Sequence, residues 1–397
     1  MTGGRFALFG CPIFDGSDFR YGAALLVENE RIAGIVGEDS IPPGHSAEQI
    51  ANGFLAPGLI DLQVNGGGGV LLNDDPSVAG IRRICAAHLR YGTTALLPTL
   101  ITDVPAKTAA ALAAARAAND VPGCIGLHLE GPHLSLARAG AHDPALIRKM
   151  AAADLDRMTA SDLPTLMVTL APESVSDRMI AALAAAGVIV SLGHSDCSFD
   201  TARIAATNGA RCVTHIFNAM SPLYHRQPGM VGAALADGRL FAGLIADGIH
   251  VDPVAIGIAI RAKLGPGKVF LVSDSMANIG SDSREFMLSG HLVKVENGRL
   301  VRDDGTLAGA DLTMIKAVRF LVETIGLDLA EALRMGSLYP AQAIRRSDEF
   351  GVFVAGARAD IIHCSDRLEL LDVWQAGVKS PLHELGAHKG IYPSLGQ

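Results

Sequence analysis

From residue 54 onward the chain alternates short apolar runs typical of strands with alanine-rich amphipathic stretches typical of helices. Strands that are joined through helices pair in parallel. About eight such repeats over roughly 300 residues predict a (β/α)8 TIM barrel, and a doubly wound open sheet is the alternative. The strand candidates are Leu59–Val64, Thr94–Leu97, Ile125–Leu129, Thr165–Leu170, Val188–Leu192, Cys212–His215, Phe241–Ile245 and Val269–Val272, and the clearest helix candidates are Ala106–Ala118, Asp177–Ala186, Phe199–Asn208 and Pro253–Leu264.

The first 53 residues carry β-type runs, and the last part of the chain carries similar ones. These runs are Arg5–Phe9, Ala23–Val27, Arg31–Val36, Ala359–His363 and Leu370–Gly377. We predict that residues 1–53 and 350–397 together form a small β-sandwich-like domain, and that residues 54–349 form the barrel between them. Within the barrel segment, Ser281–Arg302 resembles a β excursion after the last strand.

The composition excludes several classes of partner. The net charge of −8 and the pI near 5.9 predict neither nucleic-acid nor anionic-membrane binding. Six scattered cysteines without a C-x-x-C pair indicate reduced thiols and a cytoplasmic location. The first ten residues do not have the pattern of a signal peptide. No stretch approaches the roughly 20 apolar residues that a membrane-spanning helix needs.

Polar residues stand at the ends of one predicted barrel strand after another. They include Asp61, Gln63, Asn65, His128, Glu130, His133, His194, His215, Asp247, His250 and Asp274. The carboxyl ends of parallel strands share one edge of a barrel, and active sites of barrel enzymes lie at that edge. One polar residue at a strand end means little, but the repeated placement predicts a site at the barrel mouth.

Two histidines and one carboxylate among these residues fit a catalytic metal site. His194 and His215 follow successive strands, and Glu130 ends an earlier one. Catalytic zinc commonly has three protein ligands and one open position. Asp274 is then the candidate for the carboxylate that handles a proton beside the metal. The alternatives are loop or helix-capping roles for the histidines and Asp274, and a cap or ion pair for Glu130.

A series of motifs in the same order gives the chain a specific resemblance. The motifs are Pro57–Asp61, His128–Pro132, Gly140–His142, Gly193–Ser195, Thr214–Met220, Ala246–His250, Val272–Asp274 and Leu307–Gly309. Together they resemble the N-acetylglucosamine-6-phosphate deacetylases of the amidohydrolase superfamily. The resemblance implies an enzyme of amino-sugar metabolism. Such an enzyme hydrolyses the acetamide of N-acetylglucosamine 6-phosphate to glucosamine 6-phosphate and acetate.

The resemblance also implies roles for individual residues. Glu130, His194 and His215 would hold the metal. Asp274 would take the proton of the attacking water and pass it to the departing amine, and His142 would polarise the acetyl carbonyl.

Other residues would bind the sugar phosphate. The family resemblance implies that the backbone at Asn218 and Ala219, the guanidinium of Arg226 and the ring of His250 grip the phosphate, with Leu307 also contacting substrate. In this family the arginine can reach across the interface of a homodimer. The glycine run Gly66–Gly69 is not followed by G-K-[ST], so we interpret it as a turn rather than a phosphate loop.

One departure from the superfamily pattern concerns the number of metal ions. Many members end the first strand with His-x-His, whereas this chain has Gln63 and Asn65 there. Neutral amides are poor transition-metal ligands beside imidazole, so we predict one divalent metal per chain, Zn²⁺.

Two alternatives stay open for the function. One is the same chemistry on N-acetylgalactosamine 6-phosphate or another N-acyl substrate, and the other is a barrel without catalysis that acts in binding or assembly.

Overall fold

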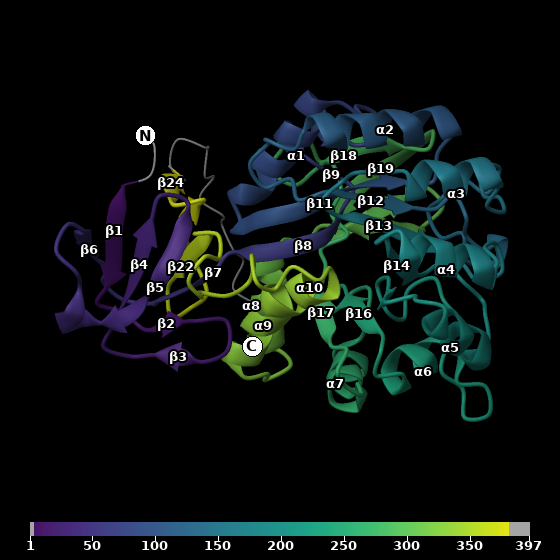
Figure 1. The fold of residues 1–397 in the computed structure, drawn as a ribbon. Coiled ribbons are helices and arrows are strands. Elements are labelled where there is room, and N and C mark those ends of the chain that lie inside the picture. The colour runs from purple at the N-terminus through teal and green to yellow at the C-terminus, as the bar shows by residue number, and fades with distance from the viewer. Residues whose placement is uncertain (1–3, 381–397) are drawn as a thin grey trace.

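The computed structural model describes residues 4–380 and contains the predicted (β/α)8 barrel (Figure 1). Eight parallel strands pair in the order β17-β16-β15-β14-β13-β12-β11-β8. Their bounds are β8 (Leu59–Val64), β11 (Thr93–Ile101), β12 (Leu127–Glu130), β13 (Leu166–Leu170), β14 (Ile189–Leu192), β15 (Cys212–Val213), β16 (Phe241–Leu244) and β17 (Val269–Leu271). Strand β11 is longer than predicted, and β15 is shorter.

Backbone contacts between the first and last strands close the ring. Val64 pairs in parallel with Ser275 beyond β17. The amide of Asp274 donates to the carbonyl of Gln63 at 3.0 Å, and the amide of Asn65 donates to the carbonyl of Ser275 at 2.9 Å. The sheet is therefore a barrel and not the doubly wound open sheet, which was the alternative. Closure also brings the segment after β17 against the end of β8.

Helices follow the strands and cover the barrel. They are α1 (Val78–Leu89), α2 (Pro105–Ala117), α3 (Ala152–Thr159), α4 (Asp177–Ala185), α5 (Phe199–Thr207), α6 (Gly229–Ala236), α7 (Pro253–Ala262), α8 (Met314–Glu323), α9 (Leu329–Gly336) and α10 (Leu338–Ala343). Local sequence fixes many of the starts. Ser77, Ser176 and Ser198 each accept a hydrogen bond from a backbone amide in the first turn, and proline begins α2 and α7.

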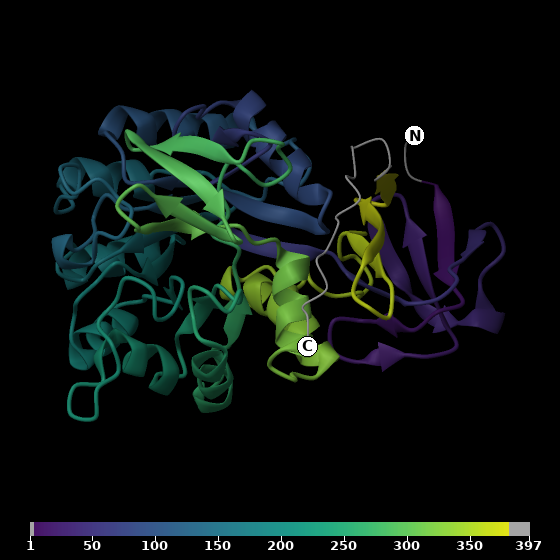
Figure 2. The ribbon, with the colours of Figure 1, turned by 180° about the vertical axis from the view of Figure 1, so that it is seen from behind.

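An antiparallel sheet lies across the barrel (Figure 2). Its strands are β18 (Glu285–Leu288), β19 (His291–Glu296), β20 (Arg299–Arg302) and β21 (Leu307–Ala310), so the predicted β excursion is longer than expected. The amide of Ala310 donates to the carbonyl of Asp274 at 2.9 Å. This contact joins the excursion to the carboxyl end of the barrel.

The two ends of the chain meet in a smaller β-rich region beside the barrel (Figure 1). One sheet has the order β5-β4-β1-β6, and the other has the order β24-β23-β22-β7-β2-β3. The strands are β1 (Arg5–Phe9), β2 (Ile13–Phe14), β3 (Phe19–Arg20), β4 (Ala23–Glu28), β5 (Arg31–Gly37), β6 (Ser46–Gln49), β7 (Phe54–Pro57), β22 (Ile361–Cys364), β23 (Leu370–Gln375) and β24 (Val378–Ser380). Antiparallel pairing of β7 with β22 joins the two ends of the chain.

The small region has an apolar core of its own, which includes Leu8, Leu25 and Trp374. The division of the chain after residues 53 and 349 stays a prediction, and residues 381–397 of the predicted domain lie outside the described residues.

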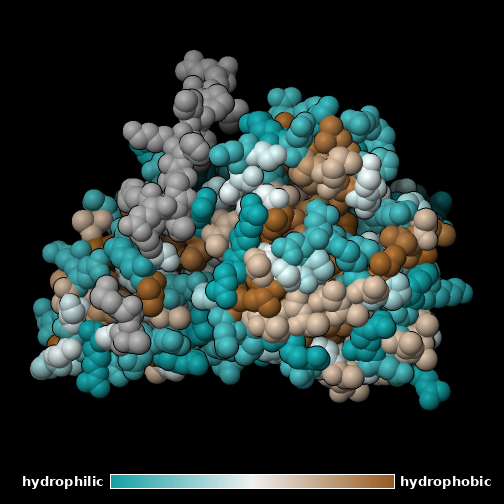
Figure 3. All heavy atoms as spheres, turned by 90° about the horizontal axis from the view of Figure 1, so that it is seen from above, coloured by the Kyte–Doolittle hydropathy of each residue, from teal (hydrophilic) through white to brown (hydrophobic). Residues whose placement is uncertain are grey.

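The cysteines and the helices match two expectations from the composition, namely reduced thiols and the absence of a membrane-spanning helix among the described residues. Hydrophobic residues on the face in Figure 3 occur as patches among hydrophilic ones. Among residues 4–380 the structure has no helix that combines the length and the apolar character needed to cross a bilayer. All six cysteines are free thiols.

Candidate active site and metal centre

Turns at the strand ends direct the polar side chains into the barrel mouth. Glu130 is the last residue of β12, and His194 and His215 each come two residues after a strand. His194, His215 and Asp274 have φ angles of 48°, 28° and 51°, in the left-handed region that non-glycine residues rarely adopt. Backbone strain of this kind is found at functional sites, where the surrounding structure maintains it.

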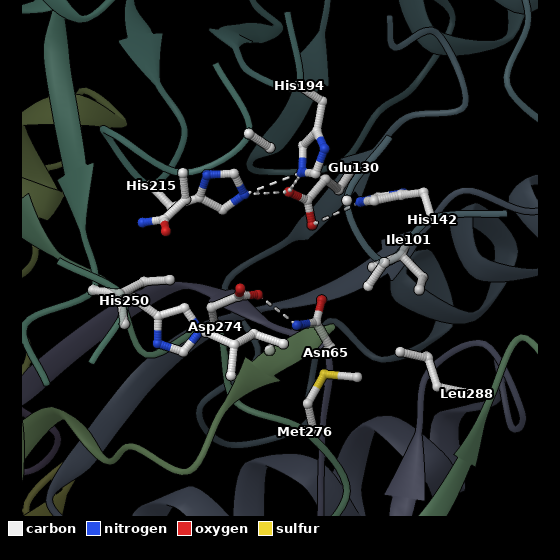
Figure 4. Close-up of a pocket in the computed structure, with 17 residues that line it drawn as sticks. Asn65, Ile101, Glu130, His142, His194, His215, His250, Asp274, Met276 and Leu288 are labelled. Carbon is white, nitrogen blue, oxygen red and sulfur yellow. Dashed lines mark hydrogen bonds and ion pairs between the residues drawn. The ribbon is translucent and has the colours of Figure 1, made fainter. Parts of the chain in front are cut away.

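Three buried ligand atoms converge in the arrangement that a tetrahedral metal requires. Oε1 of Glu130 lies 3.2 Å from Nε2 of His194 and 3.1 Å from Nε2 of His215. The two imidazole nitrogens are 3.2 Å apart. Metal bonds of about 2.0–2.2 Å in tetrahedral geometry put neighbouring ligand atoms roughly 3.3 Å apart. The donor set and its spacing therefore fit a single dication such as zinc (Figure 4).

Surrounding groups prepare these side chains as ligands. Nδ1 of His194 lies 2.8 Å from the carbonyl oxygen of Arg138, so Nδ1 carries the proton and Nε2 presents its lone pair. Burial alone would raise the pKa of Glu130. The neighbouring imidazoles of His194 and His215 outweigh that effect and hold its pKa well below its usual value. Glu130 is therefore a carboxylate.

Asp274 lies beside this cluster and is held by two amides. Its Oδ1 accepts hydrogen bonds from Nδ2 of Asn65 at 2.7 Å and from Nε2 of Gln63 at 3.1 Å. Gln63 also donates to Oε1 of Glu130 at 3.1 Å. Burial and then the charge of Glu130 raise the pKa of Asp274 to about 6. A carboxyl group with such a pKa can both accept and return a proton near neutral pH.

His142 is oriented as a hydrogen-bond donor to the cavity. Its Nδ1 accepts from the amide of Thr102 at 3.3 Å and lies 2.7 Å from the Thr102 hydroxyl. Burial, followed by the charge of His194, lowers the pKa of His142 to about 3, so the ring is neutral. Since Nδ1 is an acceptor, Nε2 carries the proton. Sequence reasoning missed Thr102, although it follows β11 in the position where other strands carry polar residues.

One cavity of about 170 Å³ contains most of the predicted site residues. Its lining combines the ligand cluster with polar groups and an apolar side (Figure 4). The predicted residues among the lining are Asn65, Glu130, His142, His194, His215, Asn218, Ala219, His250, Asp274 and Leu307. Nδ1 of His250 lies 2.6 Å from Oδ2 of Asp247, which orients the ring. Ile101, Met276 and Leu288 also line the cavity, and sequence reasoning did not single them out.

Other polar residues at the strand ends have different partners. Asp61 accepts from the amides of Gln63 and Ser273, each at 3.2 Å. His128 lies inside the barrel, 2.7 Å from the hydroxyl of Thr169. His133 lies 3.2 Å from the carbonyl oxygen of Arg148. None of these three side chains lines the cavity.

Arg226 is the predicted site residue that the chain does not bring to this cavity. It is exposed on the loop before α6 and lines a separate cavity of about 540 Å³ with Arg138, Asp196 and Tyr224. Leu223 and Tyr224 on the same loop are 54% and 60% exposed. The structure therefore does not place Arg226 at the first cavity, and its contact with substrate stays a prediction.

Comparison with known proteins gives a consistent set of relatives. The model of the amidohydrolase family matches residues 54–381. An N-acetylgalactosamine-6-phosphate deacetylase from Shewanella sp. (strain ANA-3) is 43% identical over 83% of this chain and 84% of its own. An N-acetylglucosamine-6-phosphate deacetylase from Haemophilus influenzae is 33% identical over 90% and 94%. The crystal structure of N-acetylglucosamine-6-phosphate deacetylase from Pasteurella multocida superimposes with a TM-score of 0.91 at 33% identity, covering 95% of this chain and 99% of that one.

Proposed function

The chain belongs to the amidohydrolase family, and on this premise we propose that it hydrolyses the N-acetyl group of N-acetyl-D-glucosamine 6-phosphate. The products are D-glucosamine 6-phosphate and acetate. The observation that supports the proposal most directly is the convergence of the buried side chains of Glu130, His194 and His215 with those of Asp274 and His142 in one cavity. The other predicted alternative, a barrel without catalysis, is not favoured because this set is complete.

We propose that one Zn²⁺ ion per chain is held by Glu130, His194 and His215. The spacing of their ligand atoms and the tautomer of His194 support this assignment. When bound, a divalent ion at this position acidifies water and polarises a carbonyl group.

The protein groups around the ligands have separate tasks in the proposed reaction. Asp274 accepts the proton of the attacking water and then gives it to the amide nitrogen as the C–N bond breaks. Because Asn65 and Gln63 occupy Oδ1, the proton goes to Oδ2. His142 donates from Nε2 to the acyl oxygen and stabilises the negative charge that develops there.

The 6-phosphate lies at the other end of the sugar from the acetamide. We propose that His250 and the backbone of Asn218 and Ala219 bind the phosphate, and that Leu307 contacts the sugar. We also propose a homodimer in which Arg226 of one chain completes the phosphate site of the other. The exposed Leu223 and Tyr224 beside Arg226 support an interface at this loop.

A comparison of the two hexosamine epimers tests the proposal. The relatives named above act on either N-acetylglucosamine 6-phosphate or its galactosamine epimer. Acetate release should be measured from both compounds, with and without a chelator. We expect release from the glucosamine compound that a chelator removes and Zn²⁺ restores. Release from the galactosamine compound alone would favour the epimer, and release from neither would contradict the proposal.

We place this activity in the cytoplasm. The six free thiols, five of them buried, support a reducing compartment. Fractionation of cells that produce the chain tests the assignment, and recovery of the enzyme outside the cytoplasmic fraction would contradict it.

A further inference from the structure

One side of the catalytic cavity is an apolar wall whose residues have no role in the proposed reaction. We define this acyl wall as Ile101, Met276 and Leu288, all of which line the cavity. Their exposed fractions are 7%, 2% and 4%. The three side chains belong to one apolar cluster of the barrel mouth and the β18–β21 sheet.

The acyl wall is supported from behind. Val293 on β19 and Leu300 on β20 belong to the same cluster and are fully buried. Met276 packs against Gly309, where an added Cβ would lie 2.5 Å from its Cγ. Because the interior is closely packed, the wall cannot move back without displacing the sheet.

The positions of the polar groups determine which part of the substrate faces this wall. In the proposed reaction the acyl oxygen faces the ligand cluster and Nε2 of His142, and the amide nitrogen faces Asp274. The third substituent of the carbonyl carbon is the acyl chain, which must take the remaining direction. Figure 4 shows Ile101 and Leu288 on the side of Asp274 that is opposite to His250.

From this arrangement we infer that the acyl wall selects the length of the acyl group and restricts the enzyme to formyl and acetyl amides of the hexosamine phosphate. The inference rests on the proposed deacetylase function. A methyl group fits against Ile101 and Leu288, whereas each further methylene would have to displace buried side chains. One methylene in an apolar pocket changes kcat/KM by about 10- to 200-fold.

The unmodified enzyme provides the first test. Its kcat/KM should be measured with the N-formyl, N-acetyl, N-propionyl and N-butyryl derivatives of glucosamine 6-phosphate. We expect the propionyl compound to be at least about tenfold poorer than the acetyl compound. Equal rates for acetyl and butyryl compounds would overturn the inference. Absence of acetate release would instead refute the proposed function, so the two failures differ.

Substitutions of Leu288 test the wall directly. Leu288→Ala should raise the propionyl-to-acetyl ratio of kcat/KM by about tenfold, and Leu288→Phe should lower the acetyl-to-formyl ratio. Each ratio is independent of the active fraction of a preparation, so partial misfolding does not change it. Met287→Ala is the matched control, because Met287 is the neighbouring residue on β18 and is 53% exposed. An active Leu288→Ala variant with an unchanged ratio would overturn the inference.

Discussion

Nδ2 of Asn65 donates a 2.7 Å hydrogen bond to Oδ1 of Asp274, which joins the first strand of the barrel to the segment after the last strand. Gln63 donates to the same oxygen and to Oε1 of Glu130. Both donors are neutral amides. They orient the carboxylate that we propose as the proton acceptor.

The first prediction concerns that carboxylate. Asp274→Asn should reduce kcat by about 10²–10⁴-fold, because an amide cannot accept the proton of the attacking water. Metal content and substrate binding should persist. Steady-state kinetics together with elemental analysis check this, and near-normal kcat would assign the proton transfer to another residue.

The second prediction concerns the ligand cluster. His194→Ala or His215→Ala should abolish turnover and remove the metal, because each deletes one of three protein ligands. His291→Ala, at an exposed position on β19, is the control and should keep both metal and activity. Full metal content and intact activity in both ligand variants would refute the assignment.

The third prediction concerns Arg226. Arg226→Ala should raise KM for the 6-phosphate substrate, with a loss of about 1.5–3 kcal/mol for a charge-assisted hydrogen bond. Turnover of unphosphorylated N-acetylglucosamine should hardly change. Arg178→Ala, at an exposed position on α4, is the control. Equal losses on both substrates would show that Arg226 does not recognise phosphate.

A mixed dimer tests whether Arg226 acts across an interface. One chain carries Arg226→Ala and the other carries His215→Ala, so each chain alone is defective. If Arg226 enters the partner's cavity, one of the two sites then contains both native residues. The mixed dimer should regain up to half of the native activity, and the absence of any gain would contradict the arrangement.

The fourth prediction concerns stability at low pH. Two hydrogen bonds from Arg148 hold the pKa of buried Asp154 at about 2. The pKa of an aspartate in the unfolded chain is higher, so the ionised Asp154 stabilises the fold above about pH 4. That contribution is lost as the pH falls toward 2. Asp154→Asn should lower the free energy of unfolding at pH 7 by about 2 kcal/mol, and by much less near pH 2.5.

Urea denaturation at the two pH values measures this difference. Asp156→Asn, at an exposed position on the same helix, is the control. An equal loss at both pH values would show that the Asp154 carboxylate charge is not the cause.

Sequence patterns predicted the barrel well because its strands are continuous apolar runs, and β8 has the predicted bounds. They failed at β15, where Thr214 and His215 were expected to continue the strand. The left-handed turn at His215 is set by the site and not by local hydrophobicity.

The sequence analysis also did not find the acyl wall. Ile101, Met276 and Leu288 resemble ordinary core residues in sequence, and only the folding of β18–β21 over the mouth brings them together.

The last prediction concerns the number of metal ions. A second dication near β8 would lie about 3.5–4 Å from the first ion and would need strong donors of its own. The amide nitrogens of Gln63 and Asn65 instead point at the oxygens of Glu130 and Asp274, and they are donors rather than ligands. We therefore expect one tightly bound metal per chain. Elemental analysis and anomalous diffraction check the number, and Gln63→His combined with Asn65→His should raise the capacity toward two. Two fully occupied metal peaks in the unmodified barrel mouth would contradict the prediction, because the amides could not keep their present hydrogen bonds beside a second ion.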